Sequence, residues 1–338
     1  MPNNSTSLSK LLEQQLGVMN ASGYEETKFL TTGYPPLNKV LSGKYQGGVA
    51  ESRLIEIAGG PSTGKTALAT YIMAEAQRKG GVAIFMDHER SFDIRYGKRI
   101  GLSDESDVWV YQRPRTFEDS TDLASKMFPI IRENIGEEPP IVVVFDSLAS
   151  MIPAKKMDTE AADFTMHDQL ALSKLTSNSF ASIAQHVAEN NVTCIFINQL
   201  RQKIGVMYGP QTSTPGGNTP GFTYSQRIHL RSKTITLSGA GSDKSAPFGG
   251  QIVTCKIVKN KTWRPFLEAQ WKFKFREDGS GFIDVYDGVI DELVTTGVLE
   301  RAGAYIVWTD GKKYHKVSLL TKIYTEGLGE ELLSLCKD

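Results

Sequence analysis

The most informative stretch of the chain reads Leu54-Ile55-Glu56-Ile57-Ala58-Gly59-Gly60-Pro61-Ser62-Thr63-Gly64-Lys65-Thr66. Its last eight residues match the pattern G-x-x-x-x-G-K-[ST], in which small residues let backbone N–H groups turn inward around phosphate oxygens. The apolar run Leu54–Ala58 precedes the pattern, and the helical stretch Thr66–Lys79 follows it. This context predicts a phosphate-binding loop between a strand and a helix.

Individual positions of this loop have expected tasks. Lys65 supplies a point charge to the β- and γ-phosphates of a nucleoside triphosphate, and the Thr66 hydroxyl is a ligand for Mg²⁺. The positive amino-terminal end of the helix adds to the attraction. We therefore assign binding of a nucleoside triphosphate to Gly59, Gly60, Pro61, Ser62, Thr63, Gly64, Lys65, Thr66 and Ala67.

Strand-like and helix-like segments alternate along the chain beyond this loop. Three more apolar runs are typical of strands buried on both faces of a parallel sheet: Val82–Met86, Ile141–Phe145 and Thr193–Ile197. Besides Thr66–Lys79, the stretches long enough for crossover helices are Phe117–Asn134 and Asp168–Asn190. The alternation predicts an α/β fold with a mostly parallel central sheet.

Polar residues follow each of these three runs directly. They are Asp87-His88-Glu89, Asp146-Ser147 and Asn198-Gln199. Chemistry in open α/β sheets gathers at the carboxyl edge of the strands, so these side chains are expected to converge there. Asp146 suits a metal-holding role through water, Glu89 a general base for attack on the γ-phosphate, and Gln199 a γ-phosphate sensor. Together with the loop they predict a nucleotide hydrolysis site.

Composition limits the partners of the protein. The 338 residues include 38 Lys+Arg and 38 Asp+Glu, so no global charge attracts nucleic acid or membrane, and such a partner must meet a local patch. The length predicts about two domains with a sizeable core. Three scattered cysteines make a disulfide framework or zinc site unexpected. We see no signal peptide and no apolar run of about 18 residues, and we expect a cytoplasmic protein without membrane contact.

The two ends of the chain differ from its middle. Residues 7–19 have the apolar spacing of an amphipathic helix. Arg227–Leu237 and Gln251–Val258 alternate as antiparallel strands do, with a hairpin tip at Ser238–Gly250. Residues 284–338 suggest a small α+β unit with short strands at Tyr305–Thr309 and Gly311–Lys313. We expect an amino-terminal oligomerisation segment at 1–30, the core at 31–275 and a small C-terminal domain at 276–338.

Three segments resemble one family, the RecA recombinases. The segments are Ile197–Gly209 with Thr214–Asn218, then Lys256–Lys261 with Pro265-Phe266, and Asp87-His88-Glu89 with Asp93 and Tyr96. The similarity runs from about Thr31 to Phe275. It implies a RecA-like P-loop NTPase core with an N-terminal helix and a small C-terminal α+β domain, and it places adenine contacts at Asp93 and Tyr96.

The resemblance also implies a DNA-binding loop after the sensing glutamine. Arg201 and Lys203 can bind DNA phosphates, and the apolar residues interrupted by glycines can stack on exposed bases. A first DNA loop would lie within Lys156–Asp168. The DNA contacts carried over from the family are Lys174, Arg201, Lys203, Ile204, Gly205, Val206, Met207, Tyr208, Gly216, Gly217 and Asn218.

Further positions match residues that the family uses between subunits. Lys259 and Lys261 match lysines that reach the γ-phosphate of a neighbouring subunit, and we count them as catalytic with Glu89, Lys65 and Gln199. Phe222 and Arg227 match interface positions. Gly221 departs from the family, since bacterial RecA has a lysine there, and the chain ends without an acidic tail.

The implied function is that of a DNA-dependent ATPase which polymerises head to tail on single-stranded DNA and exchanges strands with homologous duplex DNA. A single-strand-binding protein or a loader is a possible further partner. Two alternatives stay open: a ring-forming motor, such as a helicase or branch-migration ATPase, and a non-catalytic accessory protein like the recombinase paralogues.

Overall fold

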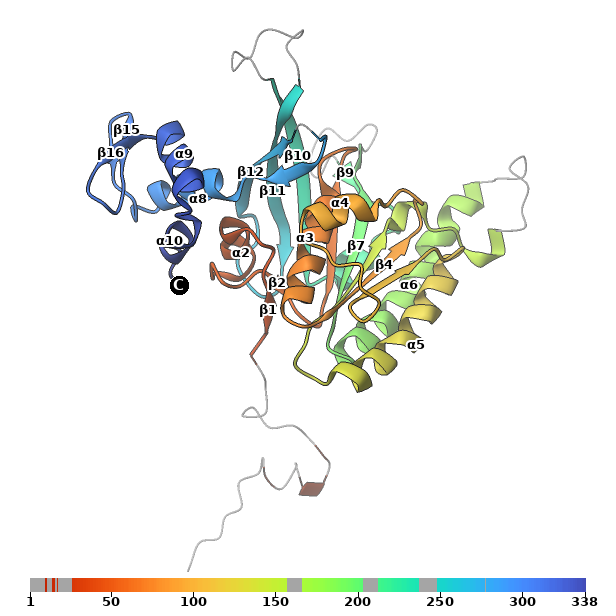
Figure 1. The fold of residues 1–338 in the computed structure, drawn as a ribbon. Helices are drawn as coiled ribbons and strands as arrows, with labels where there is room; N and C mark the ends of the chain where they lie inside the picture. Colours follow the sequence, from red (N-terminus) through yellow and green to blue (C-terminus); the bar gives the residue numbers. More distant parts are fainter. Residues whose placement is uncertain are drawn as a thin grey trace, which may run out of the picture.

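The computed structural model describes residues 26–156, 166–202, 212–236, 248–276 and 278–338, together with residues 10, 14, 15 and 17. Figure 1 shows a central sheet flanked by helices, with the C-terminal part of the chain beside it. The predicted helix at residues 7–19 and the hairpin tip at 238–250 lie mostly outside the described residues. Within the part that is described, no helix is both long and apolar enough to cross a bilayer.

A nine-stranded sheet forms the centre of the described structure, in the order β13-β12-β11-β10-β3-β7-β6-β4-β5. Adjacent strands from β10 to β5 are parallel, and those from β10 to β13 are antiparallel. The bounds are β3 Leu54–Gly59, β4 Val82–Asp87, β5 Trp109–Gln112, β6 Ile141–Asp146, β7 Val192–Gln199, β10 Gln226–Thr236, β11 Phe248–Asn260, β12 Glu268–Phe275 and β13 Gly281–Ile283. The prediction of a mostly parallel α/β sheet is confirmed.

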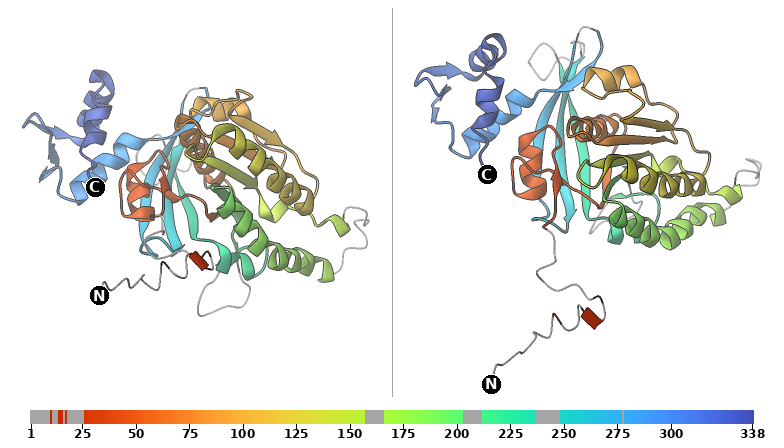
Figure 2. Two further views of the ribbon diagram at one scale, coloured as in Figure 1. Left: turned by 90° about the horizontal axis from the view of Figure 1, so that it is seen from below. Right: turned by 60° about the horizontal axis from the view of Figure 1, so that its bottom comes forward.

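Helices cover both faces of the parallel strands (Figure 2). Alternate residues of each strand point to opposite faces, so Ile55 and Ile57 share a core with α2 (Pro35–Ser42) and α3 (Lys65–Arg78). Leu54 instead shares a core with α5 (Phe117–Ile135) and α6 (Met166–Glu189). This double cover explains why the predicted strands are apolar at almost every position.

Local signals account for where some helices begin. Thr116 precedes α5 and forms a capping box with Asp119, which satisfies two backbone N–H groups at the helix start. Helix α4 (Ile94–Arg99) begins after Asp93, whose carboxylate accepts a hydrogen bond from the Arg95 N–H. Shorter elements within the described ranges are β1 Phe29–Leu30, β2 Val49–Ala50 and the 3₁₀ turns η2 Leu148–Ser150 and η3 Ala154–Lys156.

The predicted antiparallel pair corresponds to β10 and β11, and it has a further neighbour. Strand β10 also pairs in parallel with β3, with Arg227 beside Glu56. The hairpin is therefore continuous with the strand that leads into the glycine-rich loop. Local alternation of residues could not reveal this pairing, because it joins segments far apart in the sequence.

The C-terminal part has the predicted α+β composition. It contains α8 Val285–Thr295, β14 Arg301–Ala302, β15 Tyr305–Val307, β16 Lys313–His315, α9 Lys316–Glu326 and α10 Gly329–Ser334. Its strands form a separate three-stranded sheet, and β16 begins two residues later than the predicted strand at 311. Leu293, Trp308, Leu319 and Leu332 form its buried core.

Candidate nucleotide and nucleic-acid site

The glycine-rich loop connects β3 to α3 at the carboxyl edge of the sheet. A side chain at Gly59 would overlap the Thr63 hydroxyl and the Leu230 carbonyl oxygen, and Gly64 has a φ of 85°. Both positions therefore favour glycine. Lys65 Nζ donates to the carbonyl oxygen of Gly60 at 2.8 Å. The loop encloses a cavity of about 530 Å³, which is also lined by Glu89, Asp146 and Gln199.

Thr66 and Asp146 meet at the floor of this cavity. The Thr66 hydroxyl donates to Asp146 Oδ2 at 2.7 Å. Burial raises the pKa of Asp146 to about 6, and burial also lowers the pKa of Lys65, which the charges of Asp146 and Glu89 partly oppose. A hydroxyl and a carboxylate are the hard oxygen ligands that Mg²⁺ prefers. The residues present therefore fit a magnesium ion bound with a nucleotide.

Glu89 lies on the turn after β4, and it lines the cavity together with Asp146. Its backbone N–H and that of His88 donate to the Asp146 carbonyl oxygen, at 3.1 and 2.7 Å. Ser147 Oγ donates to Glu89 Oε1 at 2.6 Å, which orients the carboxylate. An oriented carboxylate at the edge of a phosphate cavity can hold and deprotonate a water molecule.

The buried carboxylate of Asp87 stabilises the same turn through hydrogen bonds. Its oxygens accept hydrogen bonds from the backbone N–H groups of residues 90–92 and from the Tyr111 hydroxyl, at 2.6 to 3.4 Å. Sequence reasoning grouped Asp87 with the strand-end polar residues and gave it no separate role. The available signal was an aspartate followed by turn residues, since Asp side chains commonly cap such turns.

Gln199 connects the nucleotide cavity to the predicted DNA loop. It is the last residue of β7, and the N–H of the next residue, Leu200, donates to the Gly59 carbonyl oxygen at 3.2 Å. Arg201 is exposed and begins β8 (Arg201–Gln202), which pairs with β9 (Thr212–Ser213). The predicted contacts Lys203, Ile204, Gly205, Val206, Met207 and Tyr208 lie outside the described residues.

The chain after β9 packs against α6. Gly216 and Gly217 have φ angles of 98° and 78°, and the Gly216 carbonyl accepts a hydrogen bond from Thr176 at 2.6 Å. Asn218 precedes the short helix α7 (Thr219–Thr223) and is exposed. Lys174 is exposed on α6, two residues before Thr176. The structure thus brings the predicted contacts 174 and 216–218 onto neighbouring elements.

The four predicted interface residues do not line the phosphate cavity of their own subunit. Lys259 donates to the carbonyl oxygens of Gly221 and Phe222 at 2.9 and 2.6 Å. Burial and the charges of Lys261 and Arg227 lower the pKa of Lys259 to about 8. Lys261 and Phe222 are exposed, whereas Arg227 pairs with Glu56 inside the chain.

The predicted adenine contacts also lie away from the cavity lining. Asp93 caps α4 and forms an ion pair with Arg95, whose hydrogen bonds lower the pKa of Asp93. Tyr96 is half-buried against the core on the α3 side, and burial raises its pKa. Their contact with a nucleotide base stays a prediction.

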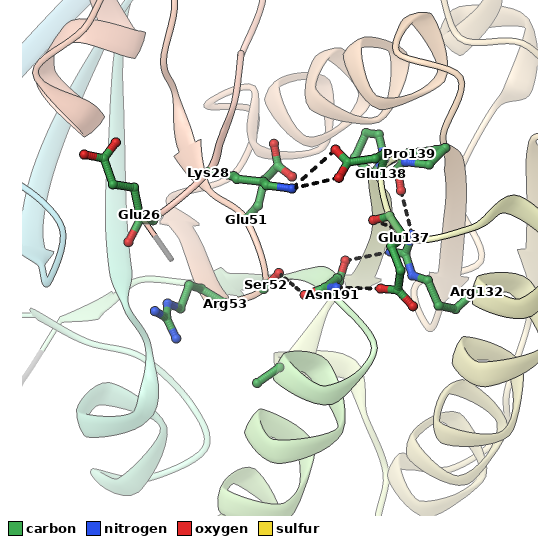
Figure 3. Close-up of a pocket in the computed structure, with 13 residues that line it drawn as sticks. Glu26, Lys28, Glu51, Ser52, Arg53, Arg132, Glu137, Glu138, Pro139 and Asn191 are labelled. Carbon is green, nitrogen blue, oxygen red and sulfur yellow. Dashed lines mark hydrogen bonds and ion pairs between the residues drawn. The ribbon is translucent and has the colours of Figure 1, made fainter. Parts of the chain in front are cut away.

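A second hollow of about 470 Å³ lies at the opposite, amino-terminal edge of the parallel strands (Figure 3). Several of its charged side chains have partners within the chain. Lys28 points toward Glu138 at 3.4 Å, Asn191 donates to Glu137 at 2.9 Å, and the Arg132 guanidinium donates to surrounding carbonyl oxygens. It contains none of the predicted site residues, so the candidate site is the cavity at the carboxyl edge.

The strand–loop–helix unit lies at the carboxyl edge of a sheet that helices cover on both faces, and Thr66 and Asp146 pair in its cavity. This arrangement defines a P-loop nucleotide-binding protein. Residues 14–280 match the family described as the RecA N-terminal domain. The chain therefore belongs to the RecA family.

Curated relatives support this assignment. Protein RecA of Bacteroides thetaiotaomicron is 32% identical over 294 residues, which are 87% of this chain and 82% of that protein. Protein RecA of Wolbachia pipientis subsp. Culex pipiens is 34% identical over 83% of this chain and 72% of its own length. The chromosomal Protein RecA of Lactococcus lactis is 33% identical, with 79% of this chain matched to 64% of that protein, which is less than two thirds of its length.

Proposed function

We propose that this protein is a DNA-dependent ATPase that assembles head to tail on single-stranded DNA and exchanges strands with homologous duplex DNA. One observation carries the proposal. Gln199 lines the phosphate cavity, and Arg201 begins the predicted DNA loop with a single residue between them. A short rigid connection of this kind lets the nucleotide state bias the conformation that grips DNA.

The residues of the cavity have different roles in ATP hydrolysis. Lys65 exchanges its contact with the Gly60 carbonyl for phosphate oxygens, and Thr66 and Asp146 hold the metal. Bound Mg²⁺ neutralises charge on the β- and γ-phosphates. Glu89, oriented by Ser147, positions and deprotonates the attacking water.

Binding of DNA rests on a local patch, because the net charge of the chain is zero. Arg201, Lys203 and Lys174 neutralise DNA phosphates, and the affinity that results falls as the salt concentration rises. The apolar residues of segment 203–211 stack on bases without sequence preference. Lys259 and Lys261 reach the nucleotide of the next subunit, and repeated head-to-tail contacts build an open helix.

ATP turnover with and without single-stranded DNA tests the proposal. Lys65→Ala is expected to lower turnover at least about 100-fold, because the variant lacks the positive charge that stabilises the transferred phosphate. Lys79→Ala, an exposed lysine after the same helix, is the control and is expected to resemble the wild type. Turnover by Lys65→Ala at the wild-type rate would show that hydrolysis takes place elsewhere.

Arg201→Ala separates the DNA step from hydrolysis. We expect turnover without DNA to stay near the wild-type rate while stimulation by single-stranded DNA falls, with a smaller salt dependence of binding. Arg301→Ala removes another exposed arginine, which lies on β14, and is the matched control. Unchanged DNA affinity in Arg201→Ala would contradict the placement of the DNA loop.

A further inference from the structure

Glu56 is a buried charged residue that does not line the phosphate cavity. It is fully buried in the middle of β3, a strand that is otherwise apolar or glycine. A buried carboxylate is costly unless each oxygen has a partner. Arg227 Nε donates to its Oε2 at 2.6 Å, and Asn198 Nδ2 donates to its Oε1 at 3.0 Å. The two partners come from β10 and β7, the strands on either side.

Both partners of Glu56 also hold the predicted DNA segment. Asn198 Nδ2 donates to the Pro215 carbonyl oxygen at 3.1 Å, and Asn198 Oδ1 accepts from the Gln199 N–H at 2.9 Å. Arg227 Nη2 donates to the Thr214 hydroxyl at 3.2 Å. One carboxylate therefore connects to the point where the chain leaves β7 and to the point where it returns.

The strand that carries Glu56 also carries the phosphate loop. Glu56 lies three residues before Gly59, and in the sheet register Glu56 is beside Arg227 while Ala58 is beside Asn198. A displacement of the loop along β3 thus moves the acceptor that fixes both ends of segment 199–215. Because Glu56 accepts hydrogen bonds on both carboxylate oxygens, this polar network is expected to be rigid enough to pass a displacement of β3 to its partners.

We propose that Glu56 is a positioning residue that couples the phosphate loop to the DNA-binding segment through Arg227 and Asn198. This proposal rests on the proposed function, since it concerns how that same site passes information from nucleotide to DNA. It assigns Arg227 a task inside the subunit, and it explains a charged residue in a strand that would otherwise be wholly apolar.

Glu56→Gln tests the coupling, because it keeps the size of the side chain and removes its charge. We expect nucleotide affinity and turnover without DNA to stay within about twofold of the wild type, since no cavity contact changes. The ratio of DNA-stimulated to basal turnover is expected to fall about tenfold, the effect of weakening one charged hydrogen bond.

A double variant separates positioning from stability. In Glu56→Gln the guanidinium of Arg227 is left without its charge partner, so the protein is expected to be less stable. Glu56→Gln with Arg227→Met removes both charges and is expected to recover stability, while the stimulation ratio stays low. Asp284→Asn is the matched control, because it removes another buried carboxylate, paired with Lys274, far from the site. It is expected to lower stability and leave the ratio unchanged.

Thr214→Val removes only the hydroxyl that Arg227 contacts and leaves the buried pair intact, so it keeps the test valid if Glu56→Gln does not fold. We expect the ratio to fall about threefold, because one hydrogen bond from the Arg227 guanidinium is lost while its ion pair with Glu56 stays. A wild-type ratio in Thr214→Val and in any folded Glu56 variant would overturn the proposal. A wild-type ratio in the double variant would overturn it as well. A wild-type protein without DNA-stimulated turnover would instead remove the proposed function itself.

Discussion

At the scale of single residues, the burial and the raised pKa of Asp146 are consistent with a carboxylate that binds a cation. The carboxylate is almost fully buried at the end of β6, and its pKa of about 6 lies above the ordinary value of 3.8. Burial is the main cause, because it disfavours the charged form, and the nearby Glu89 and Asp87 add to it. A divalent cation beside Thr66 would reverse this preference and keep the carboxylate ionised.

The raised pKa predicts a pH dependence of stability. Between about pH 4 and pH 6 the folded state binds a proton that the unfolded chain has released, so this group stabilises the fold at low pH. That contribution is lost as pH rises through 6. At about pH 8 without metal, Asp146→Asn is therefore expected to raise the free energy of unfolding by about 1–3 kcal/mol.

Urea denaturation at several pH values measures this difference between Asp146→Asn and the wild type. The difference is expected to vanish near about pH 4. Added Mg²⁺ with nucleotide should stabilise the wild type more than the variant, because the ion binds the carboxylate. A difference that is the same at all pH values would contradict a raised pKa at this position.

At the scale of elements, the turn after β4 is built as a unit around Asp87. Three consecutive backbone N–H groups and the Tyr111 hydroxyl from the adjacent β5 meet one carboxylate. The turn carries Glu89 toward the cavity, and the Asp146 carbonyl fixes its other side. Strand, turn and neighbouring strand thus together place the carboxylate of Glu89 at the cavity.

Asp87→Asn tests this arrangement, because it points an NH₂ group at backbone donors or leaves them with one acceptor fewer. We expect a loss of about 2–3 kcal/mol in the free energy of unfolding and about a tenfold lower rate of ATP hydrolysis at saturation. Nucleotide affinity should be retained, since the glycine-rich loop is a separate element. Equilibrium binding and turnover are measured on the same preparations.

Tyr111→Phe is the control for Asp87→Asn, because it removes one of the four donors and leaves the backbone contacts. It is expected to cost about 1 kcal/mol and to keep hydrolysis near the wild-type rate. Normal hydrolysis in a destabilised Asp87→Asn protein would mean that the turn does not position Glu89.

At the scale of the whole molecule, the site is incomplete within one subunit if Lys259 and Lys261 act on a neighbour. In the single chain Lys259 caps the end of α7, next to the exposed side chain of Phe222. Phe222 is 77% exposed, so its side chain is accessible to another surface. Under the proposed head-to-tail assembly, the partner surface belongs to a second copy of the chain.

Phe222→Ala is expected to weaken assembly on single-stranded DNA about tenfold in the presence of a non-hydrolysable ATP analogue, as at an aromatic interface contact. Subunit stability should change by less than about 0.5 kcal/mol, because the side chain is exposed. Sedimentation measures the assembly. Val317→Ala, at a side chain 78% exposed on α9, is the control. Equal assembly by Phe222→Ala and the wild type would remove this residue from the interface.

Electron microscopy of the same assemblies distinguishes the filament from its alternatives. Extended helical fibres are expected, because head-to-tail contacts that do not close produce open helices. Closed rings would favour a ring-forming motor. A protein that stays monomeric with DNA and nucleotide would favour the accessory alternative.

The residues of the chain indicated the strand–loop–helix unit, the parallel sheet and the polar strand ends correctly. These features are local: small residues permit one loop conformation, apolar runs mark doubly covered strands, and the strand end sets the edge of the sheet. The same reasoning could not reach the pairing of Glu56 with Arg227, which lie 171 residues apart, or the docking of Lys259 on α7. Those contacts exist only because β10 packs beside β3, and the free energy that selects this neighbour comes from burial summed over the whole sheet.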